Sequence, residues 1–279
     1  MFAELVDLLR GRRTLVLTGA GCSTESGIPD YRGPTGAMRA RQPMKYQEFI
    51  GSALGRQRYW ARSAVGWLRF KAAAPNAGHF ALAELEARGA VRGLITQNVD
   101  ALHERAGSKR VIELHGSLHR VRCLHCGLLE DRESVQQRIA FENRGVLPAS
   151  IAELQYAPDG DVSLSDETVA QFTAPSCRSC GGALKPDVIF FGENVPPHTT
   201  QDAWSLLAEA DALLVVGSSL AVFSGYRFVK AAHERGVPVA IVNRGVTRGD
   251  PQATLRVDGA AGAVLTELLS ALTTVAAAG

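Results

Sequence analysis

The sequence predicts an α/β fold built on a doubly wound parallel sheet, with a second, smaller domain inserted into it. Two observations support this prediction. Short, continuously apolar runs alternate with helical patterns along most of the 279 residues, and two cysteine pairs interrupt that alternation. Continuous apolar runs are typical of strands that helices cover on both faces. A chain of this length suits one large α/β domain with an insert.

The predicted elements follow the apolar runs and the helical spacing between them. The predicted strands are Thr14 to Leu17, Gly93 to Thr96, Arg110 to Leu114, Val188 to Phe191, Leu213 to Val216, Pro238 to Val242 and Leu255 to Val257. The predicted helices are Phe2 to Leu9, Asn76 to Arg88, Gln201 to Ala210, Tyr226 to Arg235 and Ala263 to Thr274. Asn76 is of a type that often caps a helix N-terminus. Alternation of this kind predicts ligand binding at the carboxyl ends of the strands.

Charge and hydropathy exclude some classes of protein. The formal net charge is only +2, and the basic cluster Arg39, Arg41 and Lys45 is short, so the sequence does not favour nucleic-acid binding. No export leader and no apolar span of about twenty residues is evident. We therefore expect a soluble cytoplasmic protein that does not bind membranes.

A glycine-rich turn follows the first predicted strand. Gly19, Ala20 and Gly21 are small enough for backbone N–H groups to approach a pyrophosphate, which indicates a nucleotide site. The dehydrogenase fingerprint fits poorly, because no acidic residue ends a strand about 20 residues further on. Instead, Asp30, Tyr31 and Arg32 follow a proline and add polar chemistry to the loop. The structural alternative is a glycine-rich turn without a ligand.

Small and polar residues also follow other predicted strands. The carboxyl ends of parallel strands meet at one edge of a sheet, so we expect these residues to form one site. For each segment alone, a helix cap or a tight turn is the structural alternative. The segments are Gln97 to Asp100, Glu113 to Ser117, Gly217 to Ser219 and Asn243 to Gly245.

His115 is the predicted general base. Imidazole is the side chain whose ordinary pKa suits proton transfer near neutral pH. A single histidine is more often structural, but this one lies at the end of a predicted strand, directly before a glycine. The weaker candidates are His79, His103, His119, His198 and His233.

Two C-x-x-C pairs, Cys123 with Cys126 and Cys177 with Cys180, are separated by 50 residues. Each pair can place two thiolates on one metal, and two pairs complete a tetrahedron, which favours a closed, structural Zn²⁺ site. Disulfides, a redox pair or a ligand role for His125 are the alternatives. The fifth cysteine, Cys22, lies in the glycine-rich loop, where a small buried side chain is favoured over a reactive thiol.

The ordered motifs resemble those of the sirtuins from about position 12 to about position 265. They are GAGCSTESGIPDYRG from Gly19, TQNVDALH from Thr96, ELHG from Glu113, the two C-x-x-C pairs, KPDVIFFGE from Lys185, VVGSS from Val215 and IVNRG from Ile241. Finer features resemble the class II branch, which includes the mitochondrial fourth mammalian sirtuin and bacterial relatives. The resemblance implies an NAD-dependent protein-lysine deacylase, a transferase that passes the acyl group to ADP-ribose and releases nicotinamide. NAD-dependent protein ADP-ribosylation is the alternative activity, and a non-catalytic reader of NAD or acyl-lysine is a binding-module alternative.

The resemblance also implies roles for residues. His115, Asn98 and Asp100 would be catalytic. The implied NAD contacts are Gly19, Ala20, Gly21, Thr24, Glu25, Asp30, Tyr31, Arg32, Gln97, Asn98, Val99, Asp100, Gly217, Ser218, Ser219, Asn243, Arg244, Gly245 and Ala261. The implied substrate contacts are Val188, Ile189, Phe190, Gly192 and Glu193, and the implied zinc ligands are Cys123, Cys126, Cys177 and Cys180.

The same resemblance sets the expected domains, partners and location. A Rossmann-like NAD-binding domain would comprise 1–33, 72–118 and 186–279, with 34–71 as the cofactor-binding loop and helical part of the small domain. A zinc module with a class II insert would comprise 119–185. The expected partners are acylated lysine side chains of proteins, and a mitochondrial location is the alternative for a eukaryotic source. No tyrosine lies between Pro34 and Arg39, so a succinyl preference is not favoured. The insert Ile151 to Asp166 would either contact a longer acyl chain or decorate the surface.

Overall fold

The computed structural model describes residues 1–30, 43–147 and 162–273, and its contacts divide the chain into two compact units. The first unit comprises Met1–Thr35, Ala74–Leu114 and Val195–Gly279, and the second comprises Gly36–Ala73 and His115–Asn194. Residues 115–118 and 186–194 therefore pack with the second unit, whereas the sequence grouped them with the first. The predicted residues Tyr31 and Arg32, and positions 151–161 of the insert, lie outside the described residues.

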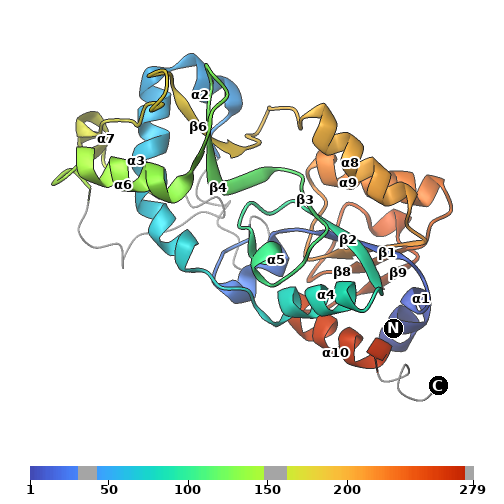
Figure 1. The fold of residues 1–279 in the computed structure, drawn as a ribbon. Coiled ribbons are helices and arrows are strands. Elements are labelled where there is room, and N and C mark those ends of the chain that lie inside the picture. The colour runs from blue at the N-terminus through green and yellow to red at the C-terminus, as the bar shows by residue number, and fades with distance from the viewer. Residues whose placement is uncertain (31–42, 148–161, 274–279) are drawn as a thin grey trace. The chain divides into compact units, whose positions relative to one another are not determined.

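The first unit contains a six-stranded sheet in the order β3-β2-β1-β7-β8-β9. Figure 1 labels β1, β2, β3, β8 and β9 of this sheet. All neighbouring strands pair in parallel. The order reverses direction at β1 and β7, as in a doubly wound sheet, so the predicted fold class is confirmed. The strands are β1 (Thr14–Thr18), β2 (Val91–Thr96), β3 (Val111–Glu113), β7 (Ala212–Val216), β8 (Val239–Val242) and β9 (Leu255–Val257).

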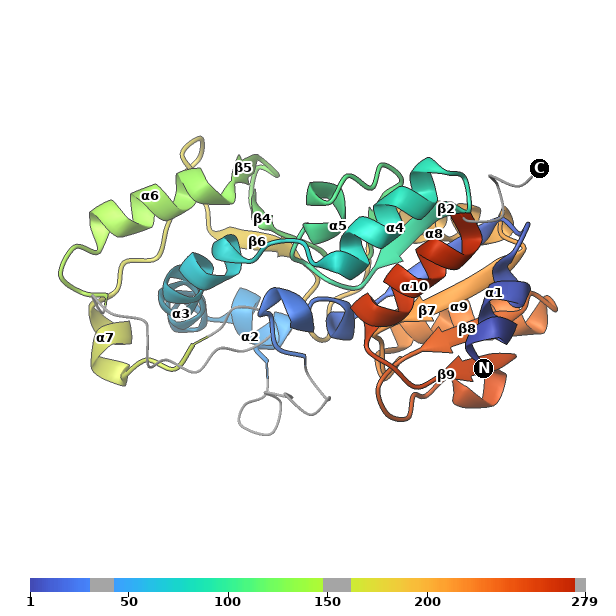
Figure 2. The ribbon, with the colours of Figure 1, turned by 90° about the horizontal axis from the view of Figure 1, so that it is seen from below.

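Helices cover both faces of this sheet, which explains why its strands are apolar throughout. Side chains alternate along β1: Val16 packs with α1, α4 and α10 on one face, while Leu15 and Leu17 pack with α8 and α9 on the other. Figure 2 shows α4 and α10 lying side by side. The helices are α1 (Phe2–Leu9), α4 (Ala77–Ala87), α5 (Leu102–Arg105), α8 (Pro197–Ala208), α9 (Phe223–Glu234) and α10 (Ala261–Thr273), with short 3-10 turns at η1 (Ala20–Cys22), η2 (Thr24–Ser26) and η4 (Asp250–Gln252).

The second unit contains a three-stranded antiparallel sheet in the order β5-β4-β6. Its core includes Phe49, Trp60 and Phe172, and the Trp60 indole N–H donates to the Leu184 carbonyl at 3.0 Å. The strands are β4 (Gly116–Cys123), β5 (Leu129–Asp131) and β6 (Leu184–Val188), and the helices are α2 (Tyr46–Gly51), α3 (Ala53–Ala72), α6 (Arg132–Glu142) and α7 (Asp166–Gln171). None of the helices described in either unit is long and apolar enough to cross a membrane.

One predicted strand, Val188 to Phe191, is wrong in its bounds and its sheet. The strand β6 ends at Val188 and pairs with β4 in the antiparallel sheet. The apolar run continues past the end of the strand, outside any regular element, and there the Ile189 N–H donates to the His115 carbonyl at 2.9 Å. An apolar run predicts burial of this kind without indicating which sheet provides it.

Candidate nucleotide and metal sites

The loops that follow β1 and β7 pack backbone against backbone at the carboxyl edge of the parallel sheet. The Gly21 N–H donates to the Gly217 carbonyl at 2.8 Å, and the Gly19 N–H donates to the Val216 carbonyl at 3.1 Å. A Cβ on Gly19 would lie 2.7 Å from the Ser218 Cβ, and one on Gly21 would lie 2.9 Å from the Gly217 oxygen. These two amides are thus already occupied, and the structure requires glycine here for loop packing.

A buried polar cluster connects the β1 loop with the loop after β2. The Ser23 hydroxyl donates to the Asp100 carboxylate at 2.7 Å and accepts from the Asn98 side-chain amide at 3.0 Å. That amide also donates to the Gly19 carbonyl at 3.1 Å, and Asp100 accepts from the Leu102 N–H at 3.0 Å. All three side chains of the cluster are at least nine-tenths buried. The predicted residues Asn98 and Asp100 are therefore brought to the glycine-rich loop.

Ser23 was missed by the sequence reasoning, although it joins the two polar residues that were chosen. Its signal was available, because it is a hydroxyl residue inside the same glycine-rich loop. The cap alternative also holds for Asp100, whose carboxylate accepts the N–H at the start of α5.

Gln97 links β1 to β7. Its side-chain amide donates to the Ser218 hydroxyl at 2.8 Å and to the Thr18 carbonyl at 3.2 Å. A Cβ on Gly225, near the start of α9, would overlap the Gln97 side chain, so glycine leaves room for it. Three predicted segments thus meet at one edge of the sheet, as the topology required.

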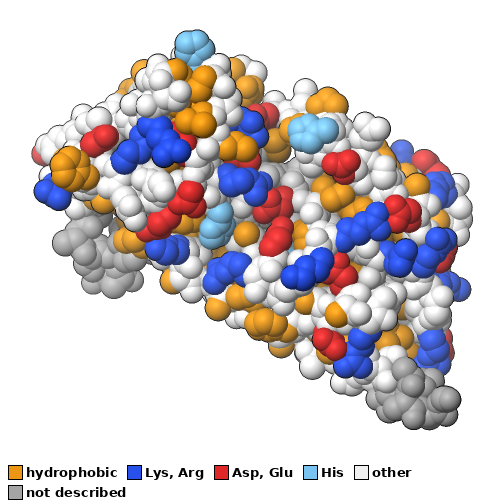
Figure 3. All heavy atoms as spheres, viewed as in Figure 1, with side chains coloured by type: hydrophobic (Ala, Val, Ile, Leu, Met, Phe, Trp, Pro, Cys, Tyr) orange, Lys and Arg blue, Asp and Glu red, His pale blue; other side chains and the backbone are white. Residues whose placement is uncertain are grey.

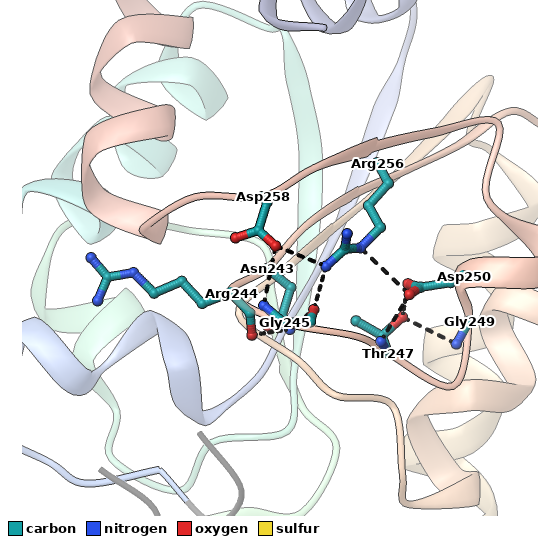
Figure 4. A network of polar contacts seen from close by, with 8 residues as sticks. All are labelled: Asn243, Arg244, Gly245, Thr247, Gly249, Asp250, Arg256 and Asp258. Atoms are coloured by element: carbon teal, nitrogen blue, oxygen red, sulfur yellow. Dashed lines mark hydrogen bonds and ion pairs between the residues drawn. The ribbon is translucent and has the colours of Figure 1, made fainter. Parts of the chain in front are cut away.

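The segment after β8 forms a network of its own, drawn in Figure 4. The Asn243 side chain donates to the carbonyls of Arg244 and Gly245 at 2.9 and 3.1 Å. Arg256 and Asp258 hold the same turn through the Gly245 carbonyl and N–H. The exposed Arg244 guanidinium points away from this network (Figure 4).

The other predicted NAD contacts lie in the same unit. The Thr24 hydroxyl donates to the Gly21 carbonyl at 3.1 Å. Glu25 lies against the N-terminus of α10, because a Cβ on Gly262 would overlap its carboxylate. A carboxylate is favourable at a helix N-terminus. The remaining positions, Ala20, Asp30, Val99, Ser219 and Ala261, are half-buried or buried.

His115 directly follows Leu114, whose N–H donates to the Thr96 carbonyl at 2.8 Å. It is half-buried, and its carbonyl accepts the Ile189 N–H. Gly116 has φ +74°, and a Cβ there would overlap the Asp187 carbonyl. The His-Gly pair is therefore fixed by the β4–β6 pairing, which brings the predicted base next to the predicted substrate segment.

An ion pair between a buried lysine and a half-buried glutamate shapes that substrate segment. The Lys185 ammonium lies 3.0 Å from the Glu193 carboxylate and donates to the Val188 carbonyl at 2.5 Å. The same carboxylate accepts the Phe190 N–H at 2.9 Å, and Gly192 provides the turn with φ +83°. Burial lowers the pKa of Lys185, and Glu193 opposes that shift.

The four cysteines of the two C-x-x-C pairs form one cluster. Their sulfurs all lie within 4.8 Å of one another, with 3.5 Å between Cys123 and Cys180 and 3.7 Å between Cys126 and Cys177. Tetrahedral coordination with Zn–S bonds of about 2.3 Å puts sulfurs about 3.8 Å apart. The Cys126 N–H donates to the Cys123 sulfur, which lowers the pKa of Cys123 to about 6 and favours the thiolate. The donor set fits one structural zinc, and the exposed His125 is not part of it.

The sequence profile of the Sir2 family matches residues 19–224. The chain belongs to the Sir2 family. This Sir2-family chain is 51% identical over 270 residues to NAD-dependent protein deacetylase 1 of Streptomyces coelicolor, covering 97% of this chain and 89% of that protein. It is 50% identical over 258 residues to the mitochondrial NAD-dependent protein lipoamidase sirtuin-4 of Bos taurus, covering 91% of this chain and 81% of that protein.

Solved Sir2 structures share the whole fold. A Sir2 homologue in complex with ADP-ribose superposes with a TM-score of 0.78 at 32% identity, covering 100% of this chain and 99% of that one. A Sir2 complex with a p53 peptide and NAD⁺ superposes with a TM-score of 0.72 at 30% identity, covering 100% of both chains. The predicted family is confirmed, and the similarity to sirtuin-4 agrees with the predicted class II branch.

Proposed function

We propose that this Sir2-family protein is an NAD-dependent protein-lysine deacylase. The reaction consumes acyl-lysine, NAD⁺ and water, and it yields lysine, nicotinamide and O-acyl-ADP-ribose. The observation that carries the proposal is the meeting of the β1, β2 and β7 loops around Gly19, Asn98 and Ser218 at one carboxyl edge of the sheet. That edge is where doubly wound folds bind nucleotides.

NAD supplies a ribose–nicotinamide bond that breaks, and the ribose then accepts the acyl group. The β1 and β7 loops would form a rigid surface against which NAD binds, because they pack too closely to leave room for side chains at Gly21 and Gly217. We assign Asn98 and Asp100 to the nicotinamide-ribose end of the site. The turn at Asn243 and Arg244 is assigned to the adenosine end. Positioning two reactants in this way contributes about 7–11 kcal/mol to such reactions.

His115 is assigned as the general base for a ribose hydroxyl. The acyl-lysine peptide is assigned to the segment Val188 to Phe190 at the end of β6, where a strand of substrate backbone would add by hydrogen bonding. The β4–β6 pairing holds both, since the Ile189 N–H donates to the His115 carbonyl. The four cysteines would fill the coordination of one zinc ion, so the ion would hold the second unit together and would take no part in the reaction.

Partner chemistry follows from the same assignment. The substrates are assigned as acylated lysines of proteins. Similar structures include Sir2 with a p53 peptide and NAD⁺, and Sir2 with a deacetylated p53 peptide and 3'-O-acetyl-ADP-ribose. On the face drawn in Figure 3, lysine and arginine side chains are interspersed with aspartate and glutamate. Such a mixed face does not provide the basic stripe that attracts a phosphate backbone.

A panel of lysine peptides bearing acetyl, longer acyl and lipoyl groups, incubated with NAD, tests the proposal. We expect one nicotinamide and one O-acyl-ADP-ribose for each lysine released, identified by mass. The panel also ranks the acyl groups, since the relatives include both deacetylases and a lipoamidase. ADP-ribose attached to a protein acceptor, without O-acyl-ADP-ribose, would instead establish the transferase alternative.

The base is tested by His115→Ala, with His233→Ala at an exposed position of α9 as the matched control. We expect the first variant to lose turnover while still binding NAD, and the control to keep both. Unchanged turnover in His115→Ala would contradict its assignment without affecting the product analysis.

A further inference from the structure

A second group of metal-ligating side chains lies in the first unit, apart from the four-cysteine cluster. Cys22, His79 and His103 each offer one ligand atom, and these atoms lie within 4.8 Å of one another. The two imidazole rings are 4.8 Å apart between centroids. All three side chains are almost completely buried, at 2%, 0% and 1% exposure. Three different segments of the chain, η1, α4 and α5, bring them together.

Each histidine leaves one ring nitrogen without a partner. The His79 Nδ1 accepts the Asn76 N–H at 3.3 Å, and the His103 Nε2 contacts the Thr18 hydroxyl at 2.9 Å. The other two nitrogens, Nε2 of His79 and Nδ1 of His103, are buried and have no hydrogen-bond partner among the described residues. Buried polar atoms are normally satisfied, so two unsatisfied nitrogens beside one thiol indicate a missing ligand.

The two histidines of the pocket suit a cation, whereas the Cys22 thiol has to lose a proton that its surroundings hold. Burial lowers the pKa of His79 to about 4 and, together with the neighbouring His79, that of His103 to about 3. Both rings are therefore neutral at pH 7, which is the form that binds metals. Burial and the nearby carboxylates of Asp100 and Glu25 raise the pKa of the Cys22 thiol. The same negative charges favour a bound cation.

We propose that Cys22, His79 and His103 bind one zinc-class, thiophilic divalent cation beneath the β1 loop. One thiolate and two imidazoles are ligands that Zn²⁺ prefers, and they leave a fourth tetrahedral position open. Ligand atoms across a tetrahedral zinc lie about 3.3–3.8 Å apart. The three ligand atoms, which now lie within 4.8 Å of one another, therefore move closer together on binding, and this shifts the loop that carries Cys22.

Binding requires two proton movements. The Cys22 S–H bond breaks, its proton passes to the buffer, and the thiolate bonds the metal. Because the Asn76 N–H donates to the His79 Nδ1, the ring proton of His79 lies on Nε2. Ligation through Nε2 requires that proton to move to Nδ1, which breaks the 3.3 Å hydrogen bond because Nδ1 can then no longer accept the Asn76 N–H. Affinity therefore rises with pH.

Occupation of this site connects with the proposed function, because Cys22 directly precedes Ser23 of the polar cluster at Asp100. We expect the bound ion to displace the β1 loop and to inhibit turnover. The inhibition of turnover rests on the proposed function, whereas the number of zinc ions bound per chain does not.

The test uses the full chain equilibrated with micromolar Zn²⁺ and freed of excess ion by gel filtration. We expect two zinc ions per chain for the wild type, and one for Cys22→Ala and Cys22→Ser, which keep the four-cysteine site. His233→Ala, an exposed histidine, should keep two. Co²⁺ added to protein with a filled four-cysteine site should produce a thiolate-to-cobalt absorption band that both Cys22 variants lack.

One zinc ion per wild-type chain would overturn the proposal, and this measurement needs no folded variant. Two ions in both wild type and Cys22→Ser would place the second ion elsewhere and would also overturn it. Equal zinc inhibition of the wild type and of Cys22→Ser would contradict the expectation that the ion at this site inhibits turnover.

Discussion

Replacing Ser23 by alanine tests how the β1 loop is held. The variant removes one hydrogen bond to a buried carboxylate, 2.7 Å long, and one from the buried Asn98 amide. A hydrogen bond to a charged group contributes about 1.5–3 kcal/mol. We therefore expect the free energy of unfolding to fall by about that amount. If the same bond positions Asp100 for NAD, kcat/KM falls by about 10- to 100-fold.

The matched control is Thr24→Ala, in the same loop. Its hydroxyl donates to a neutral carbonyl at 3.1 Å, so its removal should cost only about 0.5–1.5 kcal/mol. Urea unfolding followed by circular dichroism gives both values, and nicotinamide release gives kcat/KM. A Ser23→Ala variant no less stable than Thr24→Ala would refute the idea that the buried Ser23–Asp100 bond holds the loop.

Three further predictions concern other contacts. Gly217→Ala should destabilise the protein by about 2–4 kcal/mol, because φ is +60° and a Cβ would overlap the Cys22 amide. The same variant should weaken NAD binding in titration calorimetry. The control is Gly236→Ala, which has φ +71° but open space around it, so it measures the cost of the backbone conformation alone. Glu193→Gln should lower the free energy of unfolding by about 1–3 kcal/mol, because it leaves the buried Lys185 ammonium without its carboxylate. It should also raise the KM for peptide but not the KM for NAD. Equal rises in both KM values would contradict this prediction. Acid should destabilise the wild type below pH 6.5, since unfolded histidine binds a proton there while His79 and His103 stay neutral down to about 4 and 3. Replacing His103 by Gln should reduce that slope by about 1.4 kcal/mol per pH unit, measured by urea unfolding across pH 4.5–6.5.

The sequence predicted the parallel sheet well because its strands are short apolar runs with helices between them. For β7, for example, the run Leu213 to Val216 differs from the observed strand by one residue. The metal site of the four cysteines was also predictable from the sequence, because C-x-x-C spacing implies that the cysteines share one metal ion in any surrounding fold. Asn76 was also confirmed as the cap of α4.

The remaining features depend on contacts between distant segments. The apolar run at Val188 gave no sign that β6 pairs with β4, because apolar character does not encode a partner strand. Gly19 and Gly21 were chosen for access to phosphate, yet the structure uses them to admit the β7 loop. The grouping of Cys22 with His79 and His103 joins positions up to 81 residues apart, which no local pattern reveals.

The single hydrogen bond from Ile189 to the His115 carbonyl has a consequence for engineering this protein. Substitutions at positions 188–190 act on the segment whose Ile189 N–H holds the His115 carbonyl, so they also shift the backbone of His115. Under the proposed assignments, peptide selectivity and turnover are coupled through this bond, and libraries that vary this segment should be screened for both properties.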